Sequence, residues 1–143
     1  MSEKYQDSNF ILDFKAFLKD NIRVLKNNIY IYTTSRKTTF PCVVLSYNNN
    51  IEIQEGIDSS RELNFQRVSL NIDVYYKDSE NIDSNFEETL KLKDKIVNTI
   101  EYSKNYKNLI KTYDSNVPNI DETICRWRLT FEGVVSVKEN YLV

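Results

Sequence analysis

Arg126, Trp127 and Arg128 follow one another near the C-terminus, and this combination suits the binding of single-stranded nucleic acid. In such sites bases stack on aromatic rings while arginines pair with phosphates. In a β-strand, however, alternate side chains point to opposite faces of the sheet, so Trp127 faces away from both arginines. We therefore favour a buried tryptophan with two outward arginines, which suit a protein interface because arginine is enriched there.

Asp73 and Glu132 are the two carboxylates that could be paired in an active site. Nothing in the sequence brings them together, and carboxylates on strands commonly form cross-strand ion pairs with residues such as Arg128. Few other side chains could position a substrate. We therefore expect no catalytic residues and no enzymatic activity.

Several residue types that support chemistry are scarce or missing. The 143-residue chain has no histidine, which excludes Ser-His and Cys-His nucleophile pairs and histidine-ligated zinc. Its two glycines, Gly56 and Gly133, cannot build a glycine-rich phosphate loop. Cys42 and Cys125 are far apart and form no CxxC motif. We expect two buried free thiols, with a disulfide between them as the alternative, and neither a metal nor a cofactor.

The charge and apolar patterns limit the partners of this chain. Nineteen basic residues against twenty-one acidic ones give a net charge of -2, whereas duplex-binding proteins usually carry a strongly basic face. The apolar run Cys42–Leu45 is far shorter than the roughly 18–20 residues that span a bilayer. The N-terminus has no signal-peptide pattern. We expect a soluble protein with neither a membrane partner nor a specific nucleic acid.

The chain length predicts one domain, over residues 9–143, after a polar and flexible N-terminus at residues 1–8. Apolar residues at helical spacing predict a helix over residues 9–25. Ser84 and Glu87 match a capping box that opens a second helix, ending at about Tyr102.

Strands are predicted from β-branched and aromatic residues and from alternation between apolar and polar positions. They cover residues 29–34, 42–47, 51–54 (the partner of a hairpin that turns at 48–50), 65–76, and 123–137 with a bend or bulge near Gly133. Residues 103–122 are predicted to be a long loop. The resulting fold class is α+β, with a mostly antiparallel sheet and two main helices packed on one face of a single domain.

Long strands with polar outer faces, together with the apolar C-terminal residues 141–143, leave surfaces that need covering. A symmetric oligomer covers such surfaces with few distinct contacts. Tyr75, on the polar face of the strand over residues 65–76, would favour subunit contact because tyrosine combines apolar area with a polar tip. These features favour an assembly protein over an enzyme.

The order and spacing of these segments resemble the tail terminator (tail-completion) proteins of long-tailed bacteriophages and phage-tail-like particles. The similarity lies in the helix at 10–25, in the segment Phe40–Leu45, in the strand at 68–76 with the helix after it, and in the closing block, where Val117–Glu122 precedes Arg126–Gly133. The resemblance covers most of the chain and rests on order, spacing and size.

The resemblance implies a structural virion protein that forms a hexameric ring on the head-proximal end of the tail tube. Such a ring stops tube polymerisation and provides the docking face for the head connector, or for a collar in headless particles. Its partners are further copies of itself, the tail tube protein, the sheath where a tail has one, and the connector or collar. The protein is then assembled in the host cytoplasm and resides in the virion or tail-like particle, without cofactors or catalytic residues.

Tyr75, Arg126 and Arg128 are the candidate interface residues in this interpretation. The double substitution Arg126→Glu/Arg128→Glu is expected to leave the monomer folded while weakening ring or tube binding. Three alternatives remain: another neck or head-completion protein, a single-strand nucleic-acid binding domain, and a small enzyme that uses Asp73 or Glu132.

Overall fold

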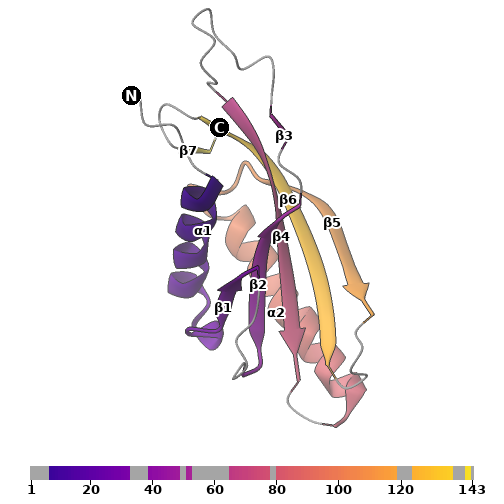
Figure 1. Ribbon diagram of the computed structural model, residues 1–143. Helices are drawn as coiled ribbons and strands as arrows, with labels where there is room; N and C mark the ends of the chain where they lie inside the picture. The colour runs from indigo at the N-terminus through magenta and orange to yellow at the C-terminus, as the bar shows by residue number, and fades with distance from the viewer. Residues whose placement is uncertain are drawn as a thin grey trace, which may run out of the picture.

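A twisted sheet with two helices on one side forms the framework of the protein (Figure 1). The computed structural model describes residues 7–32, 39–48, 51–52, 65–77, 80–118, 124–136 and 141–142. The elements in chain order are α1 (Asp7–Asn21), the 3₁₀ turn η1 (Arg23–Leu25), β1 (Ile29–Ile31), β2 (Cys42–Tyr47), β3 (Ile51–Glu52), β4 (Phe65–Tyr76), α2 (Ile82–Glu101), β5 (Ile110–Val117), β6 (Cys125–Ser136) and β7 (Tyr141–Leu142).

The described strands pair in the order β1-β2-β4-β6-β5. Only β1 and β2 run parallel; the other pairs are antiparallel. The short strand β3 pairs with β4, and β7 pairs with the end of β6. The long strands β4 and β6 match over their full lengths, from Phe65 opposite Ser136 to Tyr76 opposite Cys125. This arrangement confirms the predicted α+β class with its mostly antiparallel sheet.

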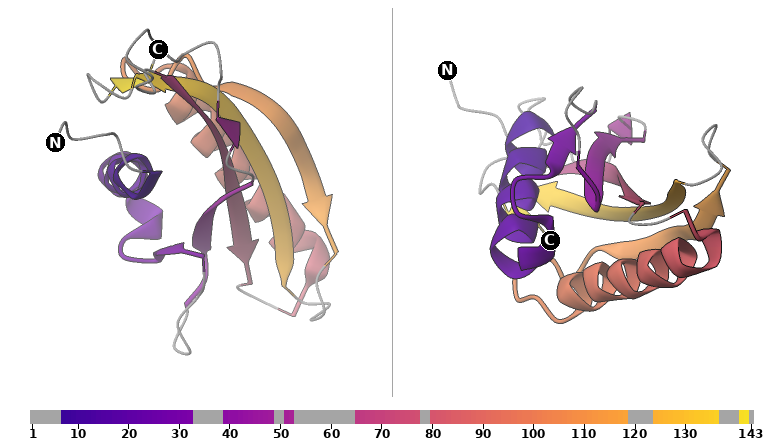
Figure 2. Two further views of the ribbon diagram at one scale, coloured as in Figure 1. Left: turned by 45° about the horizontal axis from the view of Figure 1, so that its top comes forward. Right: turned by 90° about the horizontal axis from the view of Figure 1, so that it is seen from below.

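Both helices lie on the same side of the sheet (Figure 2). Helix α1 contacts β1 and β2, while α2 contacts β4 and β6. The core between helices and sheet is one continuous cluster that includes Phe14 and Leu18 of α1, Ile96 of α2, Ile72 of β4 and Phe131 of β6. The opposite face of β4 and β6 carries the polar members of each alternating strand, and no described helix covers it.

The first helix is shorter than its apolar pattern predicts. Helix α1 ends at Asn21, because Ile22 leaves helical geometry with φ -124° and ψ 87°, and η1 follows. Ile22 and Leu25 are nevertheless buried with the core residues of α1, so the apolar periodicity continues past the end of the helix. At the other end, Asp7 and Ser8 belong to α1, whereas residues 1–6 of the expected flexible N-terminus lie outside the described residues.

The predicted capping box is wrong, since α2 begins before Ser84. Asn81 is the N-cap, and its Oδ1 accepts hydrogen bonds from the backbone N–H groups of Asp83 (3.0 Å) and Ser84 (3.2 Å). An asparagine in this position satisfies donors that a helix start leaves unpaired. In the first turn of α2 the apolar Ile82 is exposed and the buried Asn85 is polar, so no buried apolar residue marks the start of the helix.

The predicted loop over residues 103–122 contains a strand, β5, and this prediction is therefore wrong. Most side chains of β5 are exposed on this edge strand, so apolar and polar residues do not alternate along it. A register shift between Lys111 and Tyr113 disturbs the pattern further. Of the bend or bulge predicted near Gly133 of β6, the bulge is wrong, because the β4–β6 register is continuous and the shift lies on β5.

The predicted hairpin turn at residues 48–50 is wrong as well. Ile51 and Glu52 of β3 pair with Arg67 and Gln66 of β4, and both β2 and β3 run antiparallel to β4. Strands β2 and β3 therefore run in the same direction along β4, whereas the two strands of a hairpin run in opposite directions. The end of the first predicted strand (residues 33–34) and the end of the second hairpin strand (residues 53–54) lie outside the described residues.

Candidate functional site

The polar face of β4 and β6, opposite the helices, carries four cross-strand side-chain interactions in a row. Strand alternation places Ser69, Asn71, Asp73 and Tyr75 of β4 on this face, opposite Glu132, Thr130, Arg128 and Arg126 of β6. We call this surface the open face. Several of its polar side chains are buried despite the absence of a described helix above them, because β4 and β6 are central strands flanked by neighbouring side chains.

Asp73 and Arg128 form the centre of the open face. Arg128 Nε donates to Asp73 Oδ1 at 2.8 Å and Arg128 Nη2 donates to Asp73 Oδ2 at 3.0 Å. Two parallel bonds of this kind are the strongest form of an arginine–carboxylate pair. The side chain of Asp73 is only 6% exposed, and its hydrogen bonds raise the pKa of Arg128 above the ordinary value. The cross-strand pairing expected from the sequence is confirmed.

Arg126 joins the same carboxylate less closely. Its Nη2 lies 3.4 Å from Asp73 Oδ2, and its guanidinium lies over the ring of Tyr75 at 5.5 Å. Its Nε is buried and finds no hydrogen-bond acceptor among the described residues. The pKa of Tyr75 is raised, mainly because the side chain is partly buried, so its hydroxyl group stays protonated and neutral. The structure thus brings Tyr75, Arg126 and Arg128 together around Asp73, a group that we call the arginine cluster.

The two carboxylates considered for catalysis do not meet. Glu132 accepts a hydrogen bond from Ser69 Oγ at 3.3 Å. Ser69 lies four positions from Asp73 on β4, a distance of roughly 13 Å at the rise of a strand. Between them, Thr130 Oγ1 donates to Asn71 Oδ1 at 2.7 Å. Each carboxylate therefore has its own cross-strand partner, and no acid–base pair is assembled from them.

A hollow of about 490 Å³ lies beside the arginine cluster. Its walls come from β4, β5 and β6 and from the residue after β2: Asn48, Asn71, Thr112, Tyr113, Val117, Arg128 and Thr130. A second hollow of about 260 Å³ adjoins it through Thr112 and lies over Gly133 and Val134. The open face therefore offers recesses into which a partner's side chains could fit.

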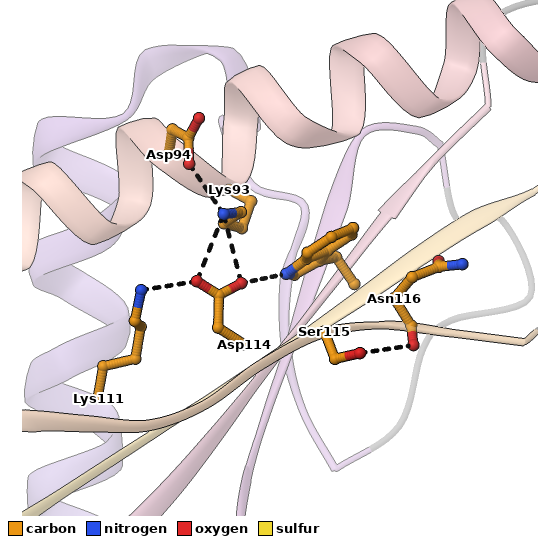
Figure 3. A network of polar contacts seen from close by, with 7 residues as sticks. Lys93, Asp94, Lys111, Asp114, Ser115 and Asn116 are labelled. Atoms are coloured by element: carbon orange, nitrogen blue, oxygen red, sulfur yellow. Dashed lines mark hydrogen bonds and ion pairs between the residues drawn. The ribbon is translucent and has the colours of Figure 1, made fainter.

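A second polar network lies on the helix side of the sheet and centres on Asp114 of β5 (Figure 3). Asp114 accepts from Lys111 Nζ at 2.6 Å and from Trp127 Nε1 at 2.6 Å, and Lys93 Nζ of α2 lies 3.3 Å away. Lys93 also pairs with Asp94 at 2.9 Å. Burial alone raises the pKa of Asp114, but the hydrogen bonds from Lys111 and Trp127 and the Lys93 charge outweigh it and lower the pKa.

This network ties the edge strand β5 to α2 and explains the position of Trp127. The indole is partly buried, packs against the core and lies 6.0 Å from the ring of Phe86 on α2. The prediction that Trp127 faces away from the two arginines is therefore confirmed. The sequence does not point to Asp114, because residues 103–122 were predicted to be a loop and a loop residue has no expected strand partner.

The remaining residues of chemical interest are structural. Cys42 and Cys125 are free and buried, as the first interpretation expected, and the alternative of a disulfide is wrong. Burial raises the pKa of Cys42 to about 12, which keeps its thiol protonated. Within the described ranges, no three His, Cys, Asp or Glu side chains are grouped as metal ligands, and no helix is long and apolar enough to cross a membrane.

Compared with known proteins, the chain matches no protein-family model and no curated protein. The features that bear on function are the arginine cluster, the recesses beside it and the edge of β5.

Proposed function

We propose that this protein is a structural assembly subunit of the tail-terminator kind. In this proposal it forms a ring on the head-proximal end of a tail tube, stops tube polymerisation and offers a docking face to the head connector or collar. The arginine cluster is the observation that carries the proposal. Tyr75, Arg126 and Arg128 lie together on a sheet face that no described helix covers, and arginine and tyrosine are the residues that dominate interface energetics.

The rigidity of this cluster supports an interface role. Arg128 is fixed by two hydrogen bonds, and Arg126 is held between Asp73 and the Tyr75 ring. Long side chains normally lose about 0.5–1.5 kcal/mol of conformational freedom each when a partner immobilises them. Because the sheet already holds these arginines, less of that cost remains when a partner binds.

Ring formation requires two different contact surfaces on each subunit, because a head-to-tail interface joins unlike patches. The open face supplies one. The outer backbone edge of β5 supplies the other, since β5 is the last strand in the order of the described sheet and pairs there on one side, with β6. Exposed strand edges are natural sites for pairing with another chain. In this account the protein works through shape and symmetry, and it needs no bound cofactor.

The test combines electron microscopy and sedimentation velocity of the purified protein with a tube-length assay. The wild-type protein is expected to form rings and to stop the growth of tail tubes assembled in vitro. Arg126→Gln should weaken both activities, whereas Arg23→Gln, an exposed arginine of η1 on the helix side of the molecule, should leave them unchanged. A protein that forms rings without affecting tube length would support the neck or head-completion alternative instead.

The nucleic-acid alternative has less support from the geometry. Trp127, the strongest stacking candidate in the sequence, packs against the core and donates to Asp114. Tyr75 and Tyr113 lie beside the arginines, but Arg126 already covers the Tyr75 ring, so Tyr113 is the ring of this pair that remains for stacking. Absence of oligonucleotide binding at low salt is therefore the expected result.

A further inference from the structure

The arginine cluster contains more positive than negative charge. Two guanidinium groups share the single carboxylate of Asp73, so the three side chains together carry a charge of +1. Arg128 donates one hydrogen bond to each oxygen of that carboxylate, at 2.8 and 3.0 Å. Arg126 reaches only Oδ2, at 3.4 Å, which is a long contact for a charged pair, normally 2.7–2.9 Å.

Arg126 therefore has hydrogen-bonding capacity that the described residues do not use. Its Nε is buried without an acceptor among them, although a buried donor without a partner is costly and rare in native proteins. The side chain as a whole is still 23% exposed, so a partner can reach it from the open face. Tyr75 supports the guanidinium plane at 5.5 Å and keeps it in position.

A ligand group approaches the exposed part of the Arg126 side chain from the adjoining recess, although Arg126 does not itself line this recess and its Nε is buried. Arg128 and Val117 line the hollow of about 490 Å³, and Val117 lies directly opposite Arg126 in the β5–β6 register. Thr130 and Tyr113 on the same wall add polar groups next to an apolar surface. A side chain that enters this recess thus comes to lie beside the arginine cluster.

The charge and shape of the cluster define its ligand. A carboxylate carries one negative charge and neutralises the excess of +1, whereas a phosphate dianion would leave the buried group negatively charged. A phosphodiester carries the same single charge as a carboxylate, but the net charge of -2 of the chain disfavours a nucleic-acid partner. A carboxylate is also planar and matches the donors of a guanidinium. Resting on the proposed role as an assembly subunit, we propose that Arg126 is the centre of a carboxylate-binding site that receives an aspartate or glutamate side chain from a protein partner.

The experiment measures the fluorescence anisotropy of labelled hexaglutamate and labelled hexaglutamine peptides as the protein is added. The protein concentration starts in the nanomolar range, so that binding is followed both below and above the concentration at which subunits associate. Saturable binding of hexaglutamate, and not of hexaglutamine, is the expected result. Competition with unlabelled hexaglutamate, inorganic phosphate and oligothymidylate then compares the anion classes.

Three variants locate the site. Arg126→Gln removes the charge and should weaken hexaglutamate binding about tenfold, the effect of losing one charge-assisted hydrogen bond. Arg126→Lys keeps the charge and should retain part of the affinity. Arg23→Gln is the matched control and should bind as the wild type does. Thermal unfolding of each variant, followed by circular dichroism, verifies that binding is compared between folded proteins.

Each outcome has a definite meaning. Unchanged hexaglutamate affinity in Arg126→Gln, or no binding by the wild type, overturns the carboxylate site. Stronger competition by phosphate or oligothymidylate than by hexaglutamate overturns it too, in favour of a phosphate or nucleic-acid site. Rings without carboxylate binding contradict this inference and leave the proposed function standing. Carboxylate binding by a strict monomer supports the site and contradicts the ring.

Discussion

Arg128 holds Asp73 through two parallel hydrogen bonds, of 2.8 and 3.0 Å, across the central strand pair β4–β6. The two residues lie directly opposite each other in the register, and the Asp73 side chain is almost fully buried. The pair thus anchors the open face and fixes one of the three candidate interface residues. Arg126 contacts the same carboxylate from a position two residues earlier on β6.

Arg128→Met should strongly destabilise the fold. The substitution leaves the buried carboxylate of Asp73 with only the long contact to Arg126, and breaking one side of a buried ion pair costs about 3–5 kcal/mol. We expect a loss of about 3 kcal/mol in the free energy of unfolding, measured by urea denaturation. The double variant Asp73→Leu/Arg128→Met should recover most of this loss; failure to recover any of it would show that the pair itself is not the cause.

The double variant Arg126→Glu/Arg128→Glu, expected from the sequence to stay folded, should be strongly destabilised. That double substitution places two new carboxylates beside the buried Asp73, where like charges repel each other and have no counter-ion. We now expect the variant to unfold at much lower urea concentrations than the wild type. A cooperative transition near the wild-type midpoint would contradict this expectation.

Arg126→Gln, in contrast, should change stability little. Arg128 still satisfies both oxygens of Asp73 in this variant, and the 3.4 Å contact that is lost belongs to a partly exposed arginine. A loss below about 1 kcal/mol is expected, with the same denaturation assay as the measurement. If Arg126→Gln destabilises the protein as much as Arg128→Met does, Arg126 is a structural residue, and weakened assembly could not be assigned to an interface.

Asp114→Asn should loosen the edge strand β5. The amide can still accept from Trp127, but the charge interactions with Lys111 and Lys93 are lost. We expect a loss of about 1–2 kcal/mol in stability, together with faster amide hydrogen exchange in β5 than in β4. Uniform exchange across the sheet in the variant would contradict a local fastening role for Asp114.

The lowered pKa of Asp114 also predicts a pH dependence of stability. A carboxyl group whose pKa is lower in the folded state stabilises the fold when it is ionised in both states. This contribution is fully present above the unfolded value of 3.8 and is lost as the pH falls from there through the folded-state pKa. Asp114→Asn should therefore lose less stability than the wild type below pH 3.8, and parallel acid-denaturation curves would argue against this contribution.

Gly133→Val should destabilise the region where β6 meets β7. A Cβ at this position would lie 2.8 Å from Leu109 Cδ2 and 2.9 Å from Leu142 Cδ1, so both leucine side chains would have to move. Crowding of this kind costs about 1–3 kcal/mol. Gly133→Ala should cost less, because leucine side chains can rotate away from one methyl group. Equal stability of the valine variant and the wild type, by urea denaturation, would contradict this packing.

The sequence predicted those parts of the fold in which one pattern dominates. Strand β4 alternates from Arg67 to Val74 and was predicted with its observed bounds, Phe65–Tyr76. Alternation also separated Trp127 from Arg126 and Arg128, because each strand residue faces opposite to its neighbours. Strand β5 was missed because its side chains are mostly exposed and its register shifts. An edge strand of this kind has no local apolar signal and depends on pairing with β6.

The candidate site was predictable in part for the same reason. Alternation placed Tyr75 and Asp73 on one face of β4, and cross-strand pairing suggested Arg128 as a partner. The sharing of one carboxylate by two arginines depends on the β4–β6 register, which no local pattern fixes. The recess beside the cluster depends on β5 as well, and that strand was not predicted.

The proposed function requires that this protein assembles into a ring, and electron microscopy of the purified protein under assembly conditions shows whether it does. We expect rings with six-fold symmetry, which should become fewer in Arg126→Gln and remain as frequent in Arg23→Gln. A strict monomer under the same conditions would overturn the proposed function.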